Sequence, residues 1–207
     1  MKKILYPITV AVALLILAVS CSTGGSVIRL GEAPAGYSTL THDGVTLRLS
    51  YIGEKDLFKL YGQKNNPFIK TFEGTLIVIE TSIQSDAPLS LLLSDARLST
   101  PGGSRGPTRK EEVSNYWYIR LSKNYSSSPS SSAGRSTFSN WSMKVTMQII
   151  DETILPDTFT VHAGAETSGY ILFDQIRGEK NVDAIFTLPV YNQQGELVHE
   201  FEFSFPL

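Results

Sequence analysis

The chain has 207 residues, a formal net charge of −2 and a single cysteine, and 42% of its residues are hydrophobic. A mildly acidic chain offers no electrostatic footprint for nucleic acid or for acidic lipid headgroups, so we exclude nucleic-acid partners. One cysteine allows no internal disulfide, and a chain of this length can bury a core without one.

The first 21 residues follow the order of an export signal. Lys2 and Lys3 precede the uncharged stretch Ile4–Val19, whose 16 residues fall short of the roughly 20 that a transmembrane helix needs. The lone Cys21 follows this stretch after one small residue, Ser20. Residues 1–20 therefore predict a cleaved signal peptide. Its removal changes the formal charge from −2 to −4, because two lysines and no acid leave.

This segment resembles the lipobox of bacterial lipoproteins, in which the cysteine after the cleavage site receives diacylglycerol and fatty acids such as palmitate. The small residue Ser20 before Cys21 fits the pattern, whereas Ala18 departs from it because Leu is usual there. The resemblance implies that Cys21 is a lipid attachment site in the bacterial cell envelope. Ser22 stands where Asp would favour the inner membrane, so we expect the outer membrane. A plain cleaved signal and an uncleaved anchor stay open as alternatives.

Residues 21–41 are small, polar and contain Gly and Pro, which predicts a flexible tether. As an alternative, Val27–Leu30 within this segment pairs as an edge strand. The remaining residues, 42–207, have the length of a single domain.

Short β-prone segments separated by turns dominate residues 42–207. Val45, Leu47 and Leu49 alternate with polar residues, which predicts a half-buried strand. Two apolar runs around the Gly-containing loop 192–196 predict a hairpin. The other predicted strands, including the two of this hairpin, are Phe72–Ile83, Leu89–Leu98, Tyr116–Leu121, Met143–Ile150, Thr158–His162, Ser168–Phe173, Ala184–Tyr191 and Leu197–Phe205.

Helical signals are few. Glu54–Tyr61 is expected to form one or two helical turns that end at Gly62. Residues 101–112 and 122–142 have the composition of loops, and the second stretch has ten serines in twenty-one residues. Such a serine-rich loop cannot bury enough apolar surface to fold alone. We therefore expect no amphipathic helix of ten or more residues after the signal.

These elements predict an all-β fold, an antiparallel β-sandwich. A similarity to a known domain family rests on three segments: Glu80–Ser85, Leu89–Leu98 and His162–Phe173. In the last of them a Gly-containing turn leads into a strand of the form S-G-x-x-x-F. In these segments the chain resembles the Ig-like domains of small bacterial surface lipoproteins. The resemblance implies an Ig-like sandwich and nothing about function, because one fold hosts many functions.

No motif along the chain indicates catalysis or metal binding. His42, His162 and His199 lie far apart, and none has a second His, Cys or paired acid at zinc-ligand spacing. The pair His42-Asp43 lies beside the tether, a poor place for a preorganised catalytic site. Pro101–Pro107 is Gly-rich but lacks the Lys-Ser/Thr ending of a phosphate loop, and no G-x-S-x-G elbow occurs. We therefore expect no metal, no cofactor and no enzymatic activity.

Aromatic residues beside the serine-rich segment are the best candidates for a binding surface. Large rigid rings next to adaptable serines suit recognition of a protein or a glycan. Alternatively, some of these rings fill the core and the others cover the sheet. The candidates are Tyr116, Trp117, Tyr118, Tyr125 and Trp141.

Three functional hypotheses follow. The first is a membrane-anchored, non-catalytic binding or structural module, whose partners are the lipid bilayer through acylated Cys21 and an envelope protein or glycan. The second is a chaperone-like envelope assembly factor that pairs a client strand with an open sheet edge. The third is an unrecognised hydrolase whose catalytic residues are distant in sequence.

Overall fold

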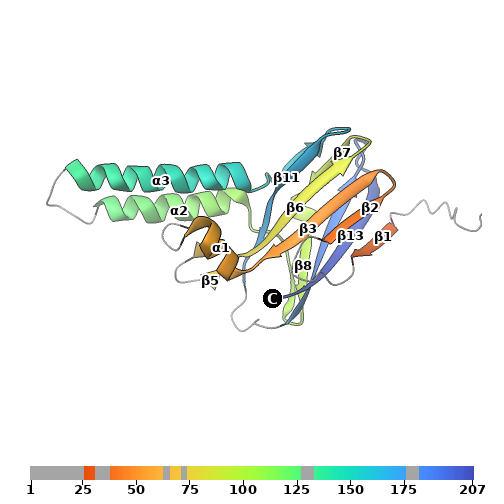
Figure 1. Cartoon of the computed structure of the whole chain (residues 1–207), viewed down its shortest axis with the longest axis horizontal. Coiled ribbons are helices and arrows are strands. Elements are labelled where there is room, and N and C mark those ends of the chain that lie inside the picture. Colours follow the sequence, from red (N-terminus) through yellow and green to blue (C-terminus); the bar gives the residue numbers. More distant parts are fainter. Residues whose placement is uncertain (1–25, 31–37, 63–65, 71–73, 127–132, 176–181) are drawn as a thin grey trace, which may run out of the picture.

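The computed structural model describes residues 26–30, 38–62, 66–70, 74–126, 133–175 and 182–207. Two β-sheets pack against each other, and a pair of long helices projects from one end of them (Figure 1). Only the backbone is described for residues 26–30, 74, 124–126 and 133–141.

The larger sheet has seven strands in the order β1-β13-β12-β7-β10, with β8 paired to β12 and β9 paired to β8. Its strands are β1 (Ser26–Leu30), β7 (Leu89–Leu92), β8 (Arg97–Thr100), β9 (Gly103–Arg105), β10 (Thr158–Val161), β12 (Asp183–Tyr191) and β13 (Leu197–Pro206). These strands pair antiparallel, except that β1 runs parallel to β13. A short 3-10 helix, η2 (Leu93–Asp95), joins β7 to β8.

The smaller sheet has four antiparallel strands in the order β11-β6-β3-β2. Its strands are β2 (Ser38–His42), β3 (Val45–Ile52), β6 (Ile77–Ser85) and β11 (Glu166–Phe173). A separate two-stranded ribbon is formed by β4 (Ile69–Lys70) and β5 (Gly74–Thr75). The prediction of a mostly antiparallel, two-sheet β structure is therefore confirmed.

Several local predictions are confirmed as well. In β3, Val45, Leu47 and Leu49 are buried, as the alternation predicts. The hairpin around residues 192–196 forms between β12 and β13. The predicted short helix is α1 (Glu54–Tyr61), which ends at a glycine with a φ of 74°. Each of these elements is specified by neighbouring residues, so local patterns were sufficient to find it.

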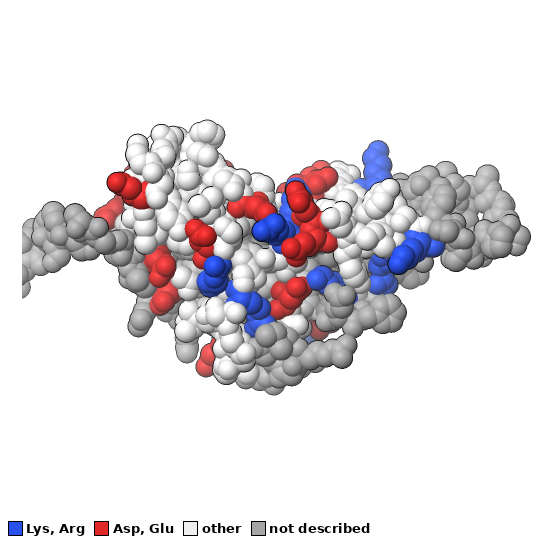
Figure 2. All heavy atoms as spheres, turned by 180° about the vertical axis from the view of Figure 1, so that it is seen from behind, with Lys and Arg blue, Asp and Glu red and all other residues white. Residues whose placement is uncertain are grey.

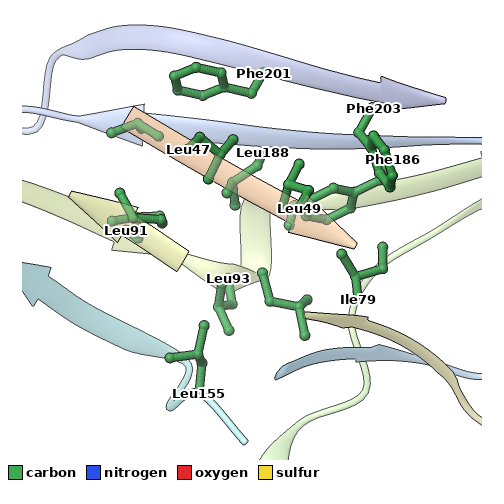
Figure 3. Close-up of a cluster of buried hydrophobic side chains, with 14 of the residues drawn as sticks. Leu47, Leu49, Ile79, Leu91, Leu93, Leu155, Phe186, Leu188, Phe201 and Phe203 are labelled. Atoms are coloured by element: carbon green, nitrogen blue, oxygen red, sulfur yellow. The ribbon is translucent and has the colours of Figure 1, made fainter. Parts of the chain in front are cut away.

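The main hydrophobic core lies between the two sheets (Figure 3). The smaller sheet contributes Leu47, Leu49 and Ile79, and the larger sheet contributes Phe186, Leu188, Phe201 and Phe203. Full burial of one such side chain stabilises a fold by about 1.5–3 kcal/mol, so this cluster is the principal source of stability for the sandwich.

A second hydrophobic core lies on the other face of the smaller sheet, under the helices α1, α2 (Lys110–Ser126) and α3 (Ala133–Thr153). Its members from the sheet include Val78, Tyr170 and Leu172, and those from the helices include Leu57, Val113, Trp117, Leu121 and Ile150. The first residues of β6 and the last four of β11 are therefore buried on both faces, which explains the apolar runs there.

The two long helices correct several predictions. Tyr116–Leu121 and Met143–Ile150 are not strands but parts of α2 and α3. Val113, Trp117 and Leu121 lie four residues apart and share one buried helix face, so packing against the sheet outweighs the β-propensity of the aromatic residues. The expectation that no helix of ten or more residues follows the signal is wrong.

The predicted loops change accordingly. Most of the serine-rich segment 122–142 is helical, and residues 127–132 lie outside the described residues. Residues 101–112 contain β9 and the first turn of α2 rather than loop alone. We refer to α2 and α3, which lie side by side in Figure 1, as the helical hairpin. The all-β prediction lacks this hairpin.

The predicted tether, residues 21–41, contains paired strands. β1 pairs with β13, in agreement with the alternative that Val27–Leu30 forms an edge strand, and β2 begins at Ser38. This pairing gives hydrogen-bond partners to the backbone N–H and C=O groups along one edge of β13. If β1 were a flexible tether, those groups would bond to water instead. The predicted signal peptide 1–20 lies outside the described residues. In the part of the chain that is described, no helix is long and apolar enough to cross a membrane.

Candidate functional site

A cavity of about 530 Å³ lies where the helical hairpin joins the sandwich. Its walls come from η2 and β8, from β9 and the segment before α2, from the segment after α3, and from β11. Segments that are far apart in sequence therefore meet around one space.

Three arginines line this cavity. Arg97 begins β8, Arg105 ends β9, and Arg109 immediately precedes α2. Among the lining residues Asp157 is the one acid, so the cavity has an excess of positive charge although the chain as a whole is acidic. We call this cavity the arginine pocket.

Two of the guanidinium groups are held by hydrogen bonds to nearby residues within or between η2 and β8. Arg97 donates through Nη1 to the carbonyl oxygen of Ala96 at 2.7 Å and also to that of Ser94. Arg105 donates through Nη2 to Thr100 Oγ1 at 3.3 Å, and its Nε and Nη1 atoms are buried. Side chains that are ordered before binding lose less conformational entropy when a ligand arrives.

The third arginine is held more weakly. Arg109 Nε lies 3.6 Å from Asp157 Oδ2, and both side chains are exposed. Exposed ion pairs of this kind contribute little net free energy. Arg109 can therefore exchange this carboxylate for an anionic group of a ligand at small cost.

The shape of the pocket depends on two backbone hydrogen bonds to β11. Thr108 N donates to Leu172 O at 2.7 Å, and Leu155 N donates to Tyr170 O at 3.1 Å. They attach the beginning and the end of the helical hairpin to the same strand. Apolar lining comes from Leu155 and its neighbours Leu93 and Ile171, so the pocket combines apolar walls with three cationic groups.

Charge on the face shown in Figure 2 is mixed. Figure 2 shows basic and acidic side chains interspersed over the described part of one face, without an extended area of one sign. Interspersed charges produce little long-range field, so the local excess in the arginine pocket is the more distinctive electrostatic feature.

The predicted aromatic residues do not form one surface. Trp117 is 2% exposed, belongs to the second core and donates Nε1 to the carbonyl oxygen of Pro67 at 3.0 Å. Tyr118 is 58% exposed, and Tyr116 is half-buried with its ring edge-on to Trp117 at 5.7 Å. The alternative interpretation, in which some of the rings fill the core, therefore holds for Trp117.

The remaining predicted site residues are less completely described. The backbones of Tyr125 and Trp141 lie in α2 and α3, and their side chains are outside the described atoms. Cys21, the predicted lipid attachment site, lies outside the described residues.

The arginines of the pocket were not identified from the sequence. Residues 101–107 lack the spacing of a phosphate loop, and their Gly and Pro residues predict a plain loop. Three arginines, Arg97, Arg105 and Arg109, lie in or beside this stretch. Arginine binds phosphate and carboxylate groups well, so this local clustering is a signal for anion binding, although it does not match the spacing of a phosphate loop.

Two of the three histidines come together in space, contrary to the expectation from their distance in sequence. His42 and His199 have ring centroids 4.9 Å apart, and Asp43 lies beside both. Burial lowers the pKa of His199 below its ordinary value, the neighbouring His42 lowers it further, and the Asp43 carboxylate raises it. His162 is exposed and lies outside this group.

Comparisons with known protein families, with curated proteins and with solved structures find no match for this chain.

Proposed function

We propose that this chain is an exported bacterial lipoprotein, anchored through acylated Cys21, that acts as a non-catalytic binding module with an Ig-like sandwich as its scaffold. The basic, apolar and cysteine-terminated N-terminal segment supports the anchor, and Ser22 after the cysteine favours the outer membrane. The arginine pocket is the site at which this module binds its ligand.

One observation supports this binding site above the others: the guanidinium groups of β8, of β9 and of the segment before α2 all line one cavity that also has apolar walls. Arginine presents a planar fork of donors that matches carboxylate and phosphate groups, and such pairs are stronger than neutral hydrogen bonds. The ligand class is therefore an anion with a carboxylate or phosphate group and an apolar part.

Strand addition at a sheet edge has less support. The outer edge of β11 is occupied in part, because Leu172 O and Tyr170 O accept the hydrogen bonds from Thr108 and Leu155. A client strand would have to displace the base of the helical hairpin to pair there. We therefore prefer the pocket to this edge as the binding element.

Isothermal titration of the full chain in detergent with phenyl phosphate tests the proposal. Phenyl phosphate joins a dianion to one apolar ring, and benzyl alcohol serves as its uncharged counterpart. We expect phenyl phosphate to bind and benzyl alcohol not to. Arg97→Gln and Arg105→Gln should each weaken binding by roughly 10- to 150-fold, since one hydrogen bond to a charged group contributes about 1.5–3 kcal/mol.

Arg48→Gln is the matched control, because Arg48 is an exposed arginine on β3 outside the pocket. It should leave the affinity unchanged. Equal binding of the charged and uncharged probes, or an equal loss in the Arg48 variant, would show that the pocket does not recognise anions.

A further inference from the structure

Outside the arginine pocket, three metal-ligating side chains meet at one end of the sandwich. His42 ends β2, Asp43 is the first residue of the turn that follows, and His199 lies on β13. The first two belong to the smaller sheet and the third to the larger sheet. The group therefore spans the two sheets.

The distances in this group are close to those of a coordination sphere. Asp43 Oδ2 lies 3.3 Å from His42 Nε2 and 4.0 Å from His199 Nε2, and the ligand atoms all lie within 4.8 Å of one another. A tetrahedral zinc ion with bonds of about 2.0–2.1 Å holds its ligand atoms about 3.4 Å apart. The side chains of His42 and Asp43 are 42% and 73% exposed, so both have room to rotate toward the buried His199 and shorten these distances.

The backbone fixes where two of the ligands lie. Asp43 and Gly44 have φ values of 46° and 76°, the left-handed pair that a tight two-residue hairpin requires. Asp86 N donates to Gly44 O at 2.9 Å, and a Cβ at Gly44 would lie 2.8 Å from an Asp86 carboxylate oxygen. The turn is thus held in place by β6 and its following residue, and His42 and Asp43 are presented toward β13.

The third ligand supplies a rigid, apolar side to the group. The His199 side chain is 4% exposed and its ring packs edge-on to Phe201 at 5.9 Å. Its lowered pKa favours the neutral imidazole, the form that binds metal. The exposed side of Asp43 leaves the opposite side of the group open to water.

We propose that His42, Asp43 and His199 bind a divalent transition-metal ion of the zinc type, with a fourth position open to solvent. Imidazole and carboxylate are ligands that zinc accepts, and three protein ligands with an open position are a known arrangement for it. The ion joins the β2–β3 hairpin to β13 and so links the two sheets.

The test uses the full chain in detergent after treatment with a chelator, with Zn²⁺ alone as the probe in competition with a chromophoric zinc indicator. We expect one tightly bound Zn²⁺ per chain and a higher thermal unfolding midpoint when it is present, because a ligand that binds only the folded state stabilises that state. Co²⁺ at the same site should give the visible absorption of a tetrahedral complex.

His42→Ala and Asp43→Asn should weaken Zn²⁺ binding by more than the roughly 10- to 100-fold that loss of an outer partner alone causes. Both residues are at the surface, and Asn keeps the left-handed turn, so these variants are expected to fold. His199→Gln tests the buried ligand. His162→Ala is the matched control and should bind Zn²⁺ as the unaltered chain does.

Equal Zn²⁺ affinity in the unaltered chain and in the His42→Ala and Asp43→Asn variants would overturn the proposal. The same conclusion would follow if His162→Ala removed binding, or if Zn²⁺ left the unfolding midpoint unchanged. The metal-free unfolding midpoint of each variant separates a lost ligand from a lost fold.

Discussion

The side chain of Leu155 occupies the space in which a side chain at Gly169 would lie. A Cβ built on Gly169 would be 2.8 Å from Leu155 Cγ and Cδ2 and 2.9 Å from the carbonyl oxygen of Thr153. Leu155 also lines the arginine pocket and belongs to the main core. The close approach of the segment after α3 to strand β11 therefore depends on a glycine in the middle of that strand.

Gly169→Ala should destabilise the chain by about 1–3 kcal/mol, the usual cost of overpacking a tight site. The backbone carbonyl of Thr153 cannot move away as a flexible side-chain end could. Urea denaturation of the two proteins measures the difference.

The control for that change is Gly106→Ala. A Cβ there meets only Arg97 Nη1 at 3.7 Å, an ordinary contact. A Gly106 variant as unstable as the Gly169 variant would mean that loss of glycine itself, rather than the contact with Leu155, is responsible.

Trp117→Phe should lower the free energy of unfolding by about 1–3 kcal/mol. The change removes the hydrogen bond from Nε1 to Pro67 O, leaves a buried acceptor without that donor, and reduces packing under α2. Denaturation followed by circular dichroism measures the effect.

Tyr118→Ala, at the neighbouring and exposed position, should change stability by no more than about 0.5 kcal/mol. If the Tyr118 variant were the less stable of the two, the assignment of Trp117 to the second core and of Tyr118 to the surface would be wrong.

The buried imidazole of His199 should make stability depend on pH. Its pKa in the folded chain is lowered from 6.5, so the unfolded chain binds more protons in the interval between the lowered value and 6.5. The stabilisation is complete above the unfolded pKa and is lost as pH falls through the folded pKa. In the presence of a chelator, the free energy of unfolding should therefore decrease as the pH is lowered from 7 to about 5, where carboxylates begin to titrate.

His199→Gln should flatten this part of the pH profile, whatever its effect on stability at pH 7. His162→Ala, a change at an exposed histidine away from His199, is the matched control variant. An unaltered slope in the His199 variant would assign the pH dependence to another group.

Cys21→Ser should abolish incorporation of labelled palmitate and release the protein from the membrane fraction, since serine offers no thiol for lipid attachment. Ala18→Leu, which introduces the residue usual at that position of a lipobox, should retain labelling. Lipid labelling that persists in the Cys21 variant would exclude this cysteine as the attachment site.

The sequence predicted those parts of the fold that neighbouring residues determine. The β12–β13 hairpin is an example, because Phe201, Phe203 and Phe205 alternate with polar residues beside a loop in which Asn192 Oδ1 accepts two backbone N–H groups. The period of two and the turn chemistry both act over a few residues.

The helical hairpin could not be found in the same way. In α3 the buried positions Ser142, Thr146 and Ile150 follow a helical spacing, but two of them are polar, so the hydrophobic pattern is weak. In α2, the aromatic residues around Trp117 favour strands by propensity. The clearer signal lies at the start of β6, where Ile77, Val78 and Ile79 follow Leu76 and these consecutive apolar residues indicate a segment buried on both faces.

The candidate sites could not be predicted from local sequence patterns, for a different reason. Arg97, Arg105 and Arg109 are near one another in sequence, but the cavity that they line also needs the segment after α3 and strand β11, which are distant in sequence. His42 meets His199 because the two sheets close on each other. Tertiary packing between distant segments completes each site, and spacing along the chain does not record that packing.

The helical hairpin leaves and rejoins the sandwich at nearly the same place, since Thr108 and Leu155 bond to carbonyl groups two residues apart on β11. An insertion with adjacent ends can lengthen, shorten or change its outer turns while the strand order of the host sandwich stays as it is. The far end of the hairpin can thus change in sequence and length independently of the main core.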